Sequence, residues 1–404
     1  MSQRYRFQNP ASEREYEKLY EVMDSAFIGE DVRSIVKRLV EHHPEMTDDN
    51  YFMVMDGDEA VAGLLLIPEK WRVDGAELKV AEMGCVGTRP EHRRKRLQWI
   101  LNKKFDEYAK EKGYDLCALA GIPYFYRQFG YQYAVELDYG TEIDAEKLPN
   151  KPVTVRDFRP EDIPEAQRLL EKTQGRYLVQ SIRTEPIWRM QEETGTYGAE
   201  PFKATAVIED GKIFAYYRWW VDEKEQTLLI REMAVESDST IEKVASSIRA
   251  EAKKQECKKI KTKLSHEDAF SKYLIGLGAS VNKPYAWQVK ILDPEEFLRK
   301  LGPVFEKRLM ESRFKGLNKA LQMNFWKYVL ELVFVDGKLV DVKRISEVGR
   351  TLGLNPYASI QLFLGYRSRE ELEGAYPDFY VRDGLGELID VLFPRKPGYI
   401  HYCY

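Results

Sequence analysis

Four consecutive basic residues stand where a predicted strand gives way to a predicted helix. The stretch RPEHRRKRL spans residues 89–97, and its basic run is Arg93, Arg94, Lys95 and Arg96. The first turn of a helix presents backbone N–H groups without intrahelical acceptors, together with the positive end of the helix dipole. A basic turn at this place is a candidate site for phosphate groups. A charge run taken alone is more often a solvated surface, and its position between strand and helix is what favours a phosphate site.

The elements around this turn can be predicted from local patterns. The apolar stretch LKVAEMGCVGT, which ends at Thr88, predicts a strand. After the turn, Leu97, Ile100 and Leu101 begin an i, i+3, i+4 pattern that is typical of an amphipathic helix. Gly113 is expected to end that helix, since glycine readily adopts the left-handed conformation of a helix C-terminus. The sequence therefore predicts a strand, a basic turn and a helix in succession.

Composition excludes several classes of protein. Of the 404 residues 44% are hydrophobic and 32% are charged, with a net charge of −4. This content is sufficient for a hydrophobic core, and the balance of charge argues against a nucleic-acid-binding protein. The four cysteines and five histidines show no metal-ligand spacing, so we expect a reduced compartment and no metal. The chain starts with polar residues and its longest aliphatic run, VAGLLLI, is too short for a membrane span, so we expect a cytoplasmic protein without a membrane partner.

The order of elements repeats along the chain. A segment at 144–152 looks like a linker, and hairpin turns are predicted on both sides of it, at Asp56-Gly57 and Asp210-Gly211. The pair Glu82-Met83 recurs as Glu232-Met233 in a strand with a similar pattern. We infer two repeats of one α+β fold. The alternative is two unrelated α+β domains whose elements happen to follow a similar order.

A third block with a different pattern follows the two repeats. It contains a long hairpin predicted around Asp336-Gly337 and several helical stretches. The sequence predicts a mixed α+β protein with domains at residues 1–147, 148–292 and 293–404.

The basic turn and an aromatic motif together resemble the GNAT N-acetyltransferase superfamily. The pyrophosphate motif of that family is Q/R-x-x-G-x-G/A, and a later motif is similar to F-Y-x-x-x-G-F/Y. Phe125, Tyr126, Gly130 and Tyr131 match the later motif in FYRQFGY. Over nearly all of its length the chain looks like the Eis-like (enhanced intracellular survival) acetyltransferases, with two GNAT domains and a sterol-carrier-protein-like domain. Its ending, LFPRKPGYIHYCY, is similar to theirs.

The resemblance implies acetyl-CoA as co-substrate, no metal, and a homo-oligomer, which is often a hexamer in relatives. The chain departs from the family where the first motif has glycine. Read from Arg93, the expected glycines fall at Arg96 and Gln98. Glycine serves there because the backbone must approach the pyrophosphate closely. The Arg96 side chain either points outward and adds a charge-assisted bond to phosphate, which we favour, or crowds the loop and weakens acetyl-CoA binding.

Three chemical tasks follow from the resemblance, because in this family an amine attacks the thioester directly. The first is to stabilise the thioester oxyanion, and the resemblance assigns a backbone N–H on the strand that holds Val86 and Thr88. The second is to protonate the leaving thiolate, which the resemblance assigns to Tyr126. A phenol of pKa ~10 gives its proton to a thiol of pKa ~8.5 at a cost of only about 2 kcal/mol. An aromatic core residue is the alternative for Tyr126, and it is our assignment for Tyr124, Tyr131 and Tyr133.

The third task is to hold and deprotonate the amine. In the Eis-like group the C-terminal carboxylate enters the active site, which here implies Tyr404 in the cleft of the first repeat. An α-carboxyl is a weak base of pKa ~3.5, and burial in an apolar cleft would raise that value. A frayed terminus is the usual alternative. The aromatic ending YIHYCY favours packing inward.

The second repeat carries VESDSTIEKV where the first carries VGTRPEHRRKRL. Acidic residues replace the basic ones, so we expect a degenerate GNAT copy without a phosphate site. The sequence thus predicts an acetyl-CoA-dependent N-acetyltransferase for a primary amine, with an aminoglycoside-like or lysine-like acceptor by family analogy. The alternatives are a CoA-binding or scaffold protein that has lost turnover, and a carrier of a hydrophobic ligand in the C-terminal domain.

Overall fold

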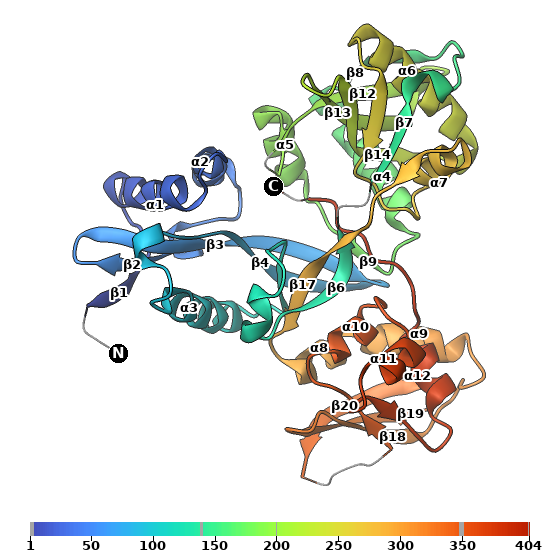
Figure 1. The fold of residues 1–404 in the computed structure, drawn as a ribbon. Helices are drawn as coiled ribbons and strands as arrows, with labels where there is room; N and C mark the ends of the chain where they lie inside the picture. The colour runs from blue at the N-terminus through green and yellow to red at the C-terminus, as the bar shows by residue number, and fades with distance from the viewer. Residues whose placement is uncertain (1–3, 138–139, 199, 347–350, 403) are drawn as a thin grey trace. The chain divides into compact units, whose positions relative to one another are not determined.

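The computed structural model describes residues 4–137, 140–198, 200–346, 351–402 and 404. The chain forms two compact units (Figure 1). The first unit contains Met1–Val135 and Trp287–Gly398, and the second contains Glu136–Ala286 and Tyr399–Tyr404. The division into three domains at 147/148 and 292/293 stays a prediction. Within the described residues, we find no helix of the length and apolar character that crossing a lipid bilayer requires.

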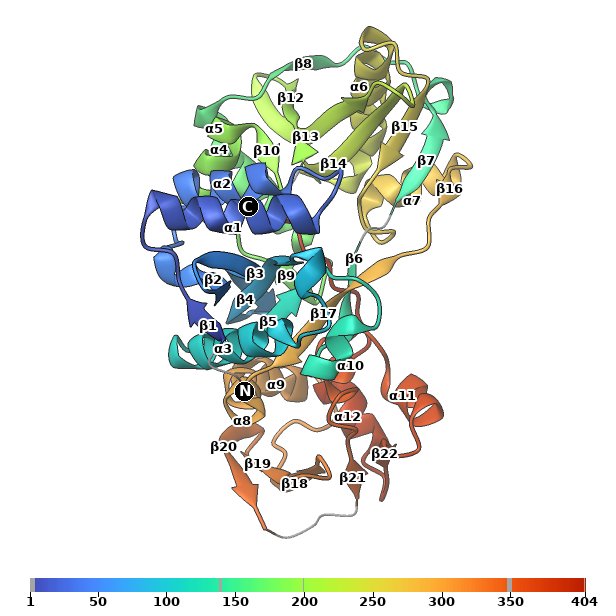
Figure 2. The ribbon, with the colours of Figure 1, turned by 60° about the vertical axis from the view of Figure 1, so that its left-hand side comes forward.

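The first sheet positions the predicted basic turn. Its strands, in spatial order, are β1 (Tyr5–Gln8), β2 (Tyr51–Asp56), β3 (Glu59–Val73), β4 (Ala76–Thr88), β5 (Leu116–Leu119), β17 (Tyr285–Ile291) and β6 (Gln132–Leu137). Strand β4 pairs antiparallel with β3 and parallel with β5. Helices α1 (Glu13–Ala26) and α2 (Val32–His42) lie on one face of this sheet, and α3 (Leu97–Glu111) lies on the other (Figures 1 and 2).

The predicted helix after the basic turn is confirmed, with Leu97, Leu101 and Phe105 buried against the sheet. Gly113 follows it with a φ of 70°, as a left-handed C-terminal residue should have. The hairpin predicted at Asp56-Gly57 connects β2 and β3, whose register ends at Asp56 opposite Glu59.

The two repeats exchange a strand, which the sequence did not reveal. Strand β17 follows the second repeat in the chain, yet it lies between β5 and β6 of the first sheet. Strand β7 (Thr141–Asp144) follows the first repeat, yet it lies in the second sheet between β16 (Ser280–Val281) and β15 (Lys259–Thr262). The partner of a strand is set by tertiary pairing, to which the alternation of apolar residues gives no clue.

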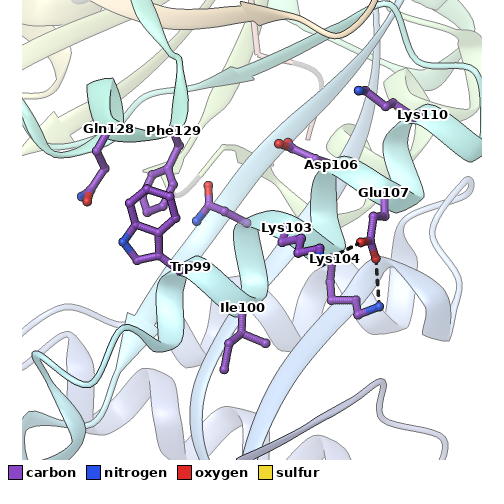
Figure 3. Close-up of a pocket in the computed structure, with 10 residues that line it drawn as sticks. Trp99, Ile100, Lys103, Lys104, Asp106, Glu107, Lys110, Gln128 and Phe129 are labelled. Carbon is purple, nitrogen blue, oxygen red and sulfur yellow. Dashed lines mark hydrogen bonds and ion pairs between the residues drawn. The ribbon is translucent and has the colours of Figure 1, made fainter. Parts of the chain in front are cut away.

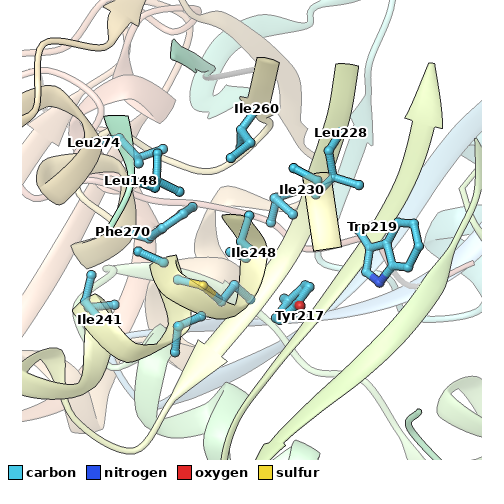
Figure 4. Packing of buried hydrophobic residues seen from close by; sticks show 14 of the residues in the cluster. Leu148, Tyr217, Trp219, Leu228, Ile230, Ile241, Ile248, Ile260, Phe270 and Leu274 are labelled. Carbon is cyan, nitrogen blue, oxygen red and sulfur yellow. The ribbon is translucent and has the colours of Figure 1, made fainter. Parts of the chain in front are cut away.

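The second sheet repeats the pattern of the first. Beyond β15 its order is β14 (Thr227–Val235), β13 (Lys212–Asp222), β12 (Lys203–Glu209) and β8 (Thr154–Asp157). The helices of this part are α4 (Ile163–Gln174), α5 (Glu185–Thr194), α6 (Ile241–Lys254) and α7 (Ala269–Gly276). Three short strands of the same part of the chain lie outside this sheet: β9 (Val179–Ser181), and β10 (Thr196–Tyr197) and β11 (Glu200–Pro201), which pair with each other. Figure 4 shows part of its core, in which Tyr217, Ile230 and Ile248 pack with Phe270.

A third sheet lies in the first unit, in the order β20, β19, β18, β21 and β22. The bounds of these strands are Lys338–Ile345, Val329–Val335, Lys319–Asn324, Leu352–Gly353 and Tyr380–Val381, and those of α8 to α12 are Pro294–Lys300, Gly302–Met310, Ser359–Phe363, Arg369–Ala375 and Gly386–Leu392. The hairpin predicted around Asp336-Gly337 is confirmed as β19 and β20. Phenyl rings pack together in this part, with the centroid of Phe393 5.2 Å from that of Phe305 and 4.9 Å from that of Phe363.

Candidate functional site

Strand β4 carries a bulge and loses one of its neighbours before it ends. In the pairing with β3, Leu65 lies opposite Gly84 and Gly63 lies opposite Gly87, so β4 has one extra residue between these pairs. Cys85, within the bulge, has a φ of 48°. The parallel pairing with β5 ends at Glu82 opposite Ala118, although β4 continues to Thr88. The backbone of residues 83–88 therefore has a described strand on one side only, and the bulge redirects its N–H groups.

The turn between β4 and α3 leaves its backbone N–H groups unpaired. A 3-10 turn (Pro90–His92) follows β4, and α3 begins at Leu97 with Arg96 as an N-cap residue whose side chain makes no cap. Among the residues that the structure describes, we find no acceptor for the amide N–H groups of residues 94–98. The side chains of residues 93–96 are exposed, and none forms an ion pair with a described residue. An open helix N-terminus surrounded by cations can bind phosphate.

Arg96 adopts a left-handed backbone conformation, which is the region that favours glycine. Its φ and ψ are 59° and 25°, in the left-handed region, and Arg94 has a φ of 63°. A residue with a Cβ pays roughly 1–2 kcal/mol for this conformation. The Arg96 side chain is exposed, so it does not pack against the core beneath the turn. Whether the side chain assists acetyl-CoA stays a prediction.

Gln98, the second expected glycine position, makes contacts that the sequence did not suggest. Its Nε2 donates to the carbonyl oxygen of Gly87 at 3.1 Å and to Oγ1 of Thr88 at 3.0 Å. These bonds join the first turn of α3 to the end of β4. No sequence signal could have found them, because a glutamine in a helix is ordinary.

The entry to the turn is anchored on β3. The backbone N–H of Arg89 donates to the carbonyl oxygen of Val61 at 2.9 Å, and its Nε donates to that of Ala60 at 2.8 Å. Its Nη2 also pairs with Glu21 at 2.9 Å. Arg89 thus anchors the turn on β3, and residues 93–96 form no ion pair with a described residue, so their charges stay available to a ligand.

Tyr126 lies in the same apolar cluster as the start of α3 and the end of β5. It belongs to a 3-10 helix (Phe125–Phe129), is buried, and packs in a cluster that includes Leu97 and Leu119. Gly121 allows this packing, because a Cβ there would lie 2.4 Å from Cε2 of Tyr126. Burial raises the pKa of the Tyr126 phenol to about 12. The phenol is therefore protonated at neutral pH, as a proton donor must be.

The neighbouring tyrosines divide between core and surface. Tyr131 is buried, as we predicted for a core residue, and burial raises its pKa well above the ordinary value. Tyr124, which we also predicted to be a core residue, is 77% exposed with a φ of 72°, so that prediction is wrong. Tyr124 begins the turn that leads into the 3-10 helix, and a turn residue is placed by the backbone and not by its own hydrophobicity.

A pocket of about 750 Å³ lies on α3 beyond the basic turn (Figure 3). The ring centroids of Trp99 and Phe129 are 4.8 Å apart at one end of it, and Trp99 is 47% exposed. Lys103 and Lys104 line the pocket and both pair with Glu107. The pocket thus combines an exposed aromatic ring with cations about two helical turns after Arg96.

The end of the chain packs within the second unit. Tyr404 contacts Ile187 and Met190, and its backbone oxygen accepts a hydrogen bond from the N–H of Gly198. Tyr404 is half-buried, so the frayed terminus that we considered is not observed. A catalytic role of its carboxylate stays a prediction.

The corresponding turn of the second repeat is closed. Glu236 pairs with Arg168 and Lys172, and Asp238 pairs with Arg176. Ser237 accepts from the N–H of residue 239 through its side chain and from the N–H of residue 240 through its carbonyl group. The N–H groups of residues 239, 240 and 241 thus have acceptors within the turn, and Arg168, Lys172 and Arg176 are paired with its carboxylates. In the described part of the chain, no group of three His, Cys, Asp or Glu side chains is arranged to hold a metal ion.

Comparisons with known proteins agree with this arrangement. A model of the acetyltransferase (GNAT) domain matches residues 8–134, which contain the basic turn and Tyr126. No curated protein matches the sequence at a significant level. Residues 8–134 thus match the acetyltransferase (GNAT) domain model, and this stretch is less than half of the chain.

Solved structures extend the likeness to the whole chain. A GCN5-related N-acetyltransferase from Anabaena variabilis is 16% identical, with a TM-score of 0.76 over 99% of this chain and 100% of that chain. A probable N-acyltransferase from Enterococcus faecalis is 17% identical, with a TM-score of 0.77 over 98% and 99%. Eis1 from Mycobacterium abscessus is 15% identical, with a TM-score of 0.67 over 99% and 100%. The predicted mixed α+β class with tandem GNAT folds is confirmed.

Proposed function

We propose that this chain, an N-acetyltransferase with its GNAT domain at residues 8–134, transfers acetyl from acetyl-CoA to a primary amine by direct attack. The observation that carries this proposal is the pairing of two open features at one end of β4. The backbone of residues 83–88 has no described strand on the side of β5, and the N–H groups of residues 94–98 have no described acceptor. An extended pantetheine arm can bond to the first, and a pyrophosphate can bond to the second.

The thioester would then lie beside the bulge of β4. We assign stabilisation of the oxyanion to a backbone N–H among Val86 and Thr88, because the bulge turns such groups away from the ladder with β3. The cations of residues 93–96 attract the phosphates, and the anchors of Arg89 keep the turn fixed before the ligand arrives. Such preorganisation reduces the entropy lost on binding.

We assign protonation of the leaving CoA thiolate to Tyr126. With a phenol pKa of about 12 and a thiol pKa of ~8.5, the transfer is uphill by about 5 kcal/mol. This exceeds the 2 kcal/mol that the unperturbed phenol would need. Burial also destabilises the thiolate anion, so the leaving thiolate accepts a proton more readily in a buried site than in water. This offsets part of the cost of the transfer.

We assign the holding and deprotonation of the acceptor amine to the Tyr404 carboxylate, on the basis of the family resemblance. A lysine-like amine has a pKa of ~10.4, so losing its proton at pH 7 costs about 4–5 kcal/mol, and a carboxylate that attracts the cation helps to hold it. Internal groups such as Glu82, which is buried on β4, are the alternative base. An aminoglycoside-like or lysine-like acceptor follows from analogy alone.

The pocket on α3 fits the nucleotide end of the cofactor. Trp99 offers an exposed ring on which a base can stack, and Lys103 offers a cation for a ribose phosphate. We therefore place the adenosine end of acetyl-CoA along α3, one turn beyond the pyrophosphate. The sterol-carrier-protein-like nature of residues 293–404 and the homo-oligomer, hexameric in relatives, stay predictions.

Calorimetry with CoA and acetyl-CoA, followed by an assay of thiol release, tests the proposal. We expect one CoA per chain, and thiol release from acetyl-CoA that depends on an added aminoglycoside or lysine peptide. Binding without release from any amine would favour the CoA-binding scaffold. Absence of CoA binding would reject the proposal and direct attention to a hydrophobic ligand of the C-terminal part.

A further inference from the structure

We propose that the second repeat is a receptor for the end of the chain, and that Arg183 and Gln191 are positioning residues which set where the Tyr404 carboxylate ends. We call the described residues 399–402 and 404 the tail, and Ser181, Arg183, Gln191 and Tyr197 the tail clamp. The catalytic consequence rests on the proposed function, in which that carboxylate receives the amine. The binding of the tail is independent of it.

The backbone of the tail is held by donors and acceptors of the second repeat. The N–H of Tyr399 donates to the carbonyl oxygen of Val179 at 3.0 Å, and the N–H of His401 donates to Oγ of Ser181 at 3.2 Å. The N–H of Tyr402 donates to the hydroxyl of Tyr197 at 2.8 Å. Backbone bonds of this kind fix the path of a segment, because they do not depend on its side-chain rotamers.

The carbonyl oxygen of Tyr402 accepts two further bonds, two residues before the chain end. Nη2 of Arg183 donates to it at 3.0 Å, and Nε2 of Gln191 donates to it at 3.2 Å. The two donors come from different segments, one before α5 and one within it. Together they fix the carbonyl group in direction as well as position.

A buried charge network fixes both donors. Arg183 bonds to Glu232 through two parallel contacts of 3.0 and 2.5 Å, and its side chain is only 1% exposed. Nη1 of Arg218 donates to Oε1 of Gln191 at 2.6 Å, which leaves the amide nitrogen of Gln191 directed at Tyr402. Burial raises the pKa of Glu232, but the charges of Arg183 and Arg218 outweigh it, so its pKa lies well below the ordinary value. The network is therefore ionised at neutral pH.

The side chains of the tail fill the surface above this network. His401 is buried, with Nδ1 3.7 Å from Oε2 of Glu232, and burial lowers its pKa to about 4 against the opposing pull of that carboxylate. The rings of Tyr399 and Tyr402 lie against those of Tyr177 and Tyr197, with centroids 5.7 Å apart in each pair. Because the side chains of the tail are mostly aromatic, its docking buries mainly apolar surface and removes few polar groups from water.

The tail occupies the place in the second repeat that we assign to the substrates in the first. The parallel pairing of β14 with β15 ends at Ile230 opposite Thr262, as that of β4 with β5 ends at Glu82. The hydroxyl of Tyr399 donates to the carbonyl oxygen of Lys263, directly after β15, and the guanidinium of Arg231 on β14 lies 5.5 Å from the ring of Tyr402. The degenerate repeat thus holds the chain end where its two central strands part.

Release of the C-terminal tyrosine by a carboxypeptidase tests the clamp in the full-length protein. Gln191→Met keeps the approximate shape of the side chain but removes both the donor to Tyr402 and the acceptor of the Arg218 bond, and we expect release to accelerate roughly 5- to 30-fold, as the loss of one or two hydrogen bonds predicts. Arg189→Met, on the exposed side of the same helix, is the matched control and should leave the rate unchanged. Equal rates for Gln191→Met and the native protein at unchanged melting temperature would overturn the proposal.

Kinetics of the same variants separate the clamp from the proposed function. If both hold, Gln191→Met lowers kcat at least several-fold while the Kd for CoA is unchanged, a division that a general loss of stability does not produce. Faster tyrosine release with a normal kcat would support the clamp and reject the catalytic role of the carboxylate.

A peptide supplied in trans provides a second measurement. The chain that ends at Gly398 should bind the labelled peptide YIHYCY with one site, and Gln191→Met should weaken that binding. A C-terminally amidated peptide should bind comparably but fail to restore turnover, because the clamp holds the backbone of Tyr402 and the reaction needs the carboxylate. A correctly folded shortened chain that does not bind the peptide would contradict the proposal.

Discussion

The turn after β4 and the turn after β14 stand at the same place in the order of elements. They differ in whether the backbone N–H groups at the start of the following helix have hydrogen-bond acceptors. After β14, the N–H of Ser239 has a serine side chain as its acceptor, and the N–H of Ile241 has the carbonyl group of Asp238. After β4, the N–H groups of residues 94–98 have no acceptor among the described residues. A helix start that the protein caps for itself is stable and inert, whereas an uncapped one is available to a ligand.

The charges differ in the same way. Glu236 and Asp238 are neutralised by three cations of the second repeat, while residues 93–96 of the first repeat carry four cations, none of which forms a close ion pair with a described residue. Leaving like charges together is unfavourable unless a ligand brings the opposite charge. The comparison indicates that a binding site can be distinguished from its degenerate copy by its backbone N–H groups without acceptors and its cations without ion pairs.

Proton chemistry separates the repeats as well. FYRQFGY of the first repeat corresponds to YLIGLGA of the second, in which Gly130 and Gly278 share a φ of 88°. At that register Leu274, a buried residue, stands where Tyr126 stands. The second repeat therefore has no phenol at this position.

Removing that phenol should have the largest effect. Tyr126→Phe should lower kcat by ~10²–10⁴-fold, because it removes the general acid, and should leave the Kd for CoA nearly unchanged. Tyr273→Phe, at the neighbouring position of the second repeat, is the control and should have normal kcat. Steady-state kinetics with calorimetry of CoA binding measures both. Normal turnover of Tyr126→Phe would assign the proton to water and the tyrosine to the core.

The buried glutamate of the second repeat should matter for folding. Glu232→Gln leaves the guanidinium of Arg183 buried without its anion, whereas Arg218 keeps Glu192 as a partner, and we expect a loss of about 3–5 kcal/mol in the free energy of unfolding. Glu236→Gln, at the surface of the same repeat, should lose no more than about 1 kcal/mol. Denaturant unfolding compares the two. Similar losses would mean that burial does not set the strength of these pairs.

The third largest effect should come from removing charge from the turn after β4, which should weaken the binding of CoA. Replacing Arg93 and Arg94 by glutamine should reduce CoA affinity by about 2–4 kcal/mol, given about 1.5–3 kcal/mol for each charged hydrogen bond and incomplete additivity. Replacing Arg168 and Lys172 of the second repeat in the same way should change affinity little, because Glu236 already occupies them. Calorimetry that finds a second, equal CoA site per chain would break the contrast between the two turns.

Local signals were sufficient to predict the elements that carry the site. The strand before the basic turn, the helix from Leu97 and the stop at Gly113 were all predicted, since each depends on residues within a few positions of one another. The hairpins at Asp56-Gly57 and Asp210-Gly211 were found for the same reason, and both glycines have positive φ values. These features are encoded by periodicity and by backbone preference.

The rest depends on contacts between distant parts of the chain. The strand exchange of β7 and β17, the bonds from Gln98 to β4 and the clamp around the tail join residues that no local pattern connects. The left-handed conformation of Arg96 could not be predicted either, because arginine is disfavoured there and only the family motif pointed to a glycine. The surface position of Tyr124 shows the converse, since an aromatic residue was taken for core where the turn places it outside.

Arg96 offers the smallest but sharpest comparison, because its backbone and its charge can be separated. Arg96→Gly relieves a left-handed residue with a φ of 59°, and the gain is offset by the greater freedom of glycine in the unfolded chain, so we expect a net stabilisation of about 0–1 kcal/mol. The exposed side chain leaves room around the turn, so CoA affinity should change by less than about fivefold.

Arg96→Ala removes the same charge but keeps a Cβ in the left-handed conformation, so it should lower CoA affinity as much as glycine does without the gain in stability. Thermal unfolding and calorimetry on both variants separate the two effects. A large rise in CoA affinity for Arg96→Gly alone would show that the Cβ and stem of the arginine obstruct the pyrophosphate. The turn after β4 would then be partly closed by its own side chain, and the difference from the turn after β14 would be one of degree.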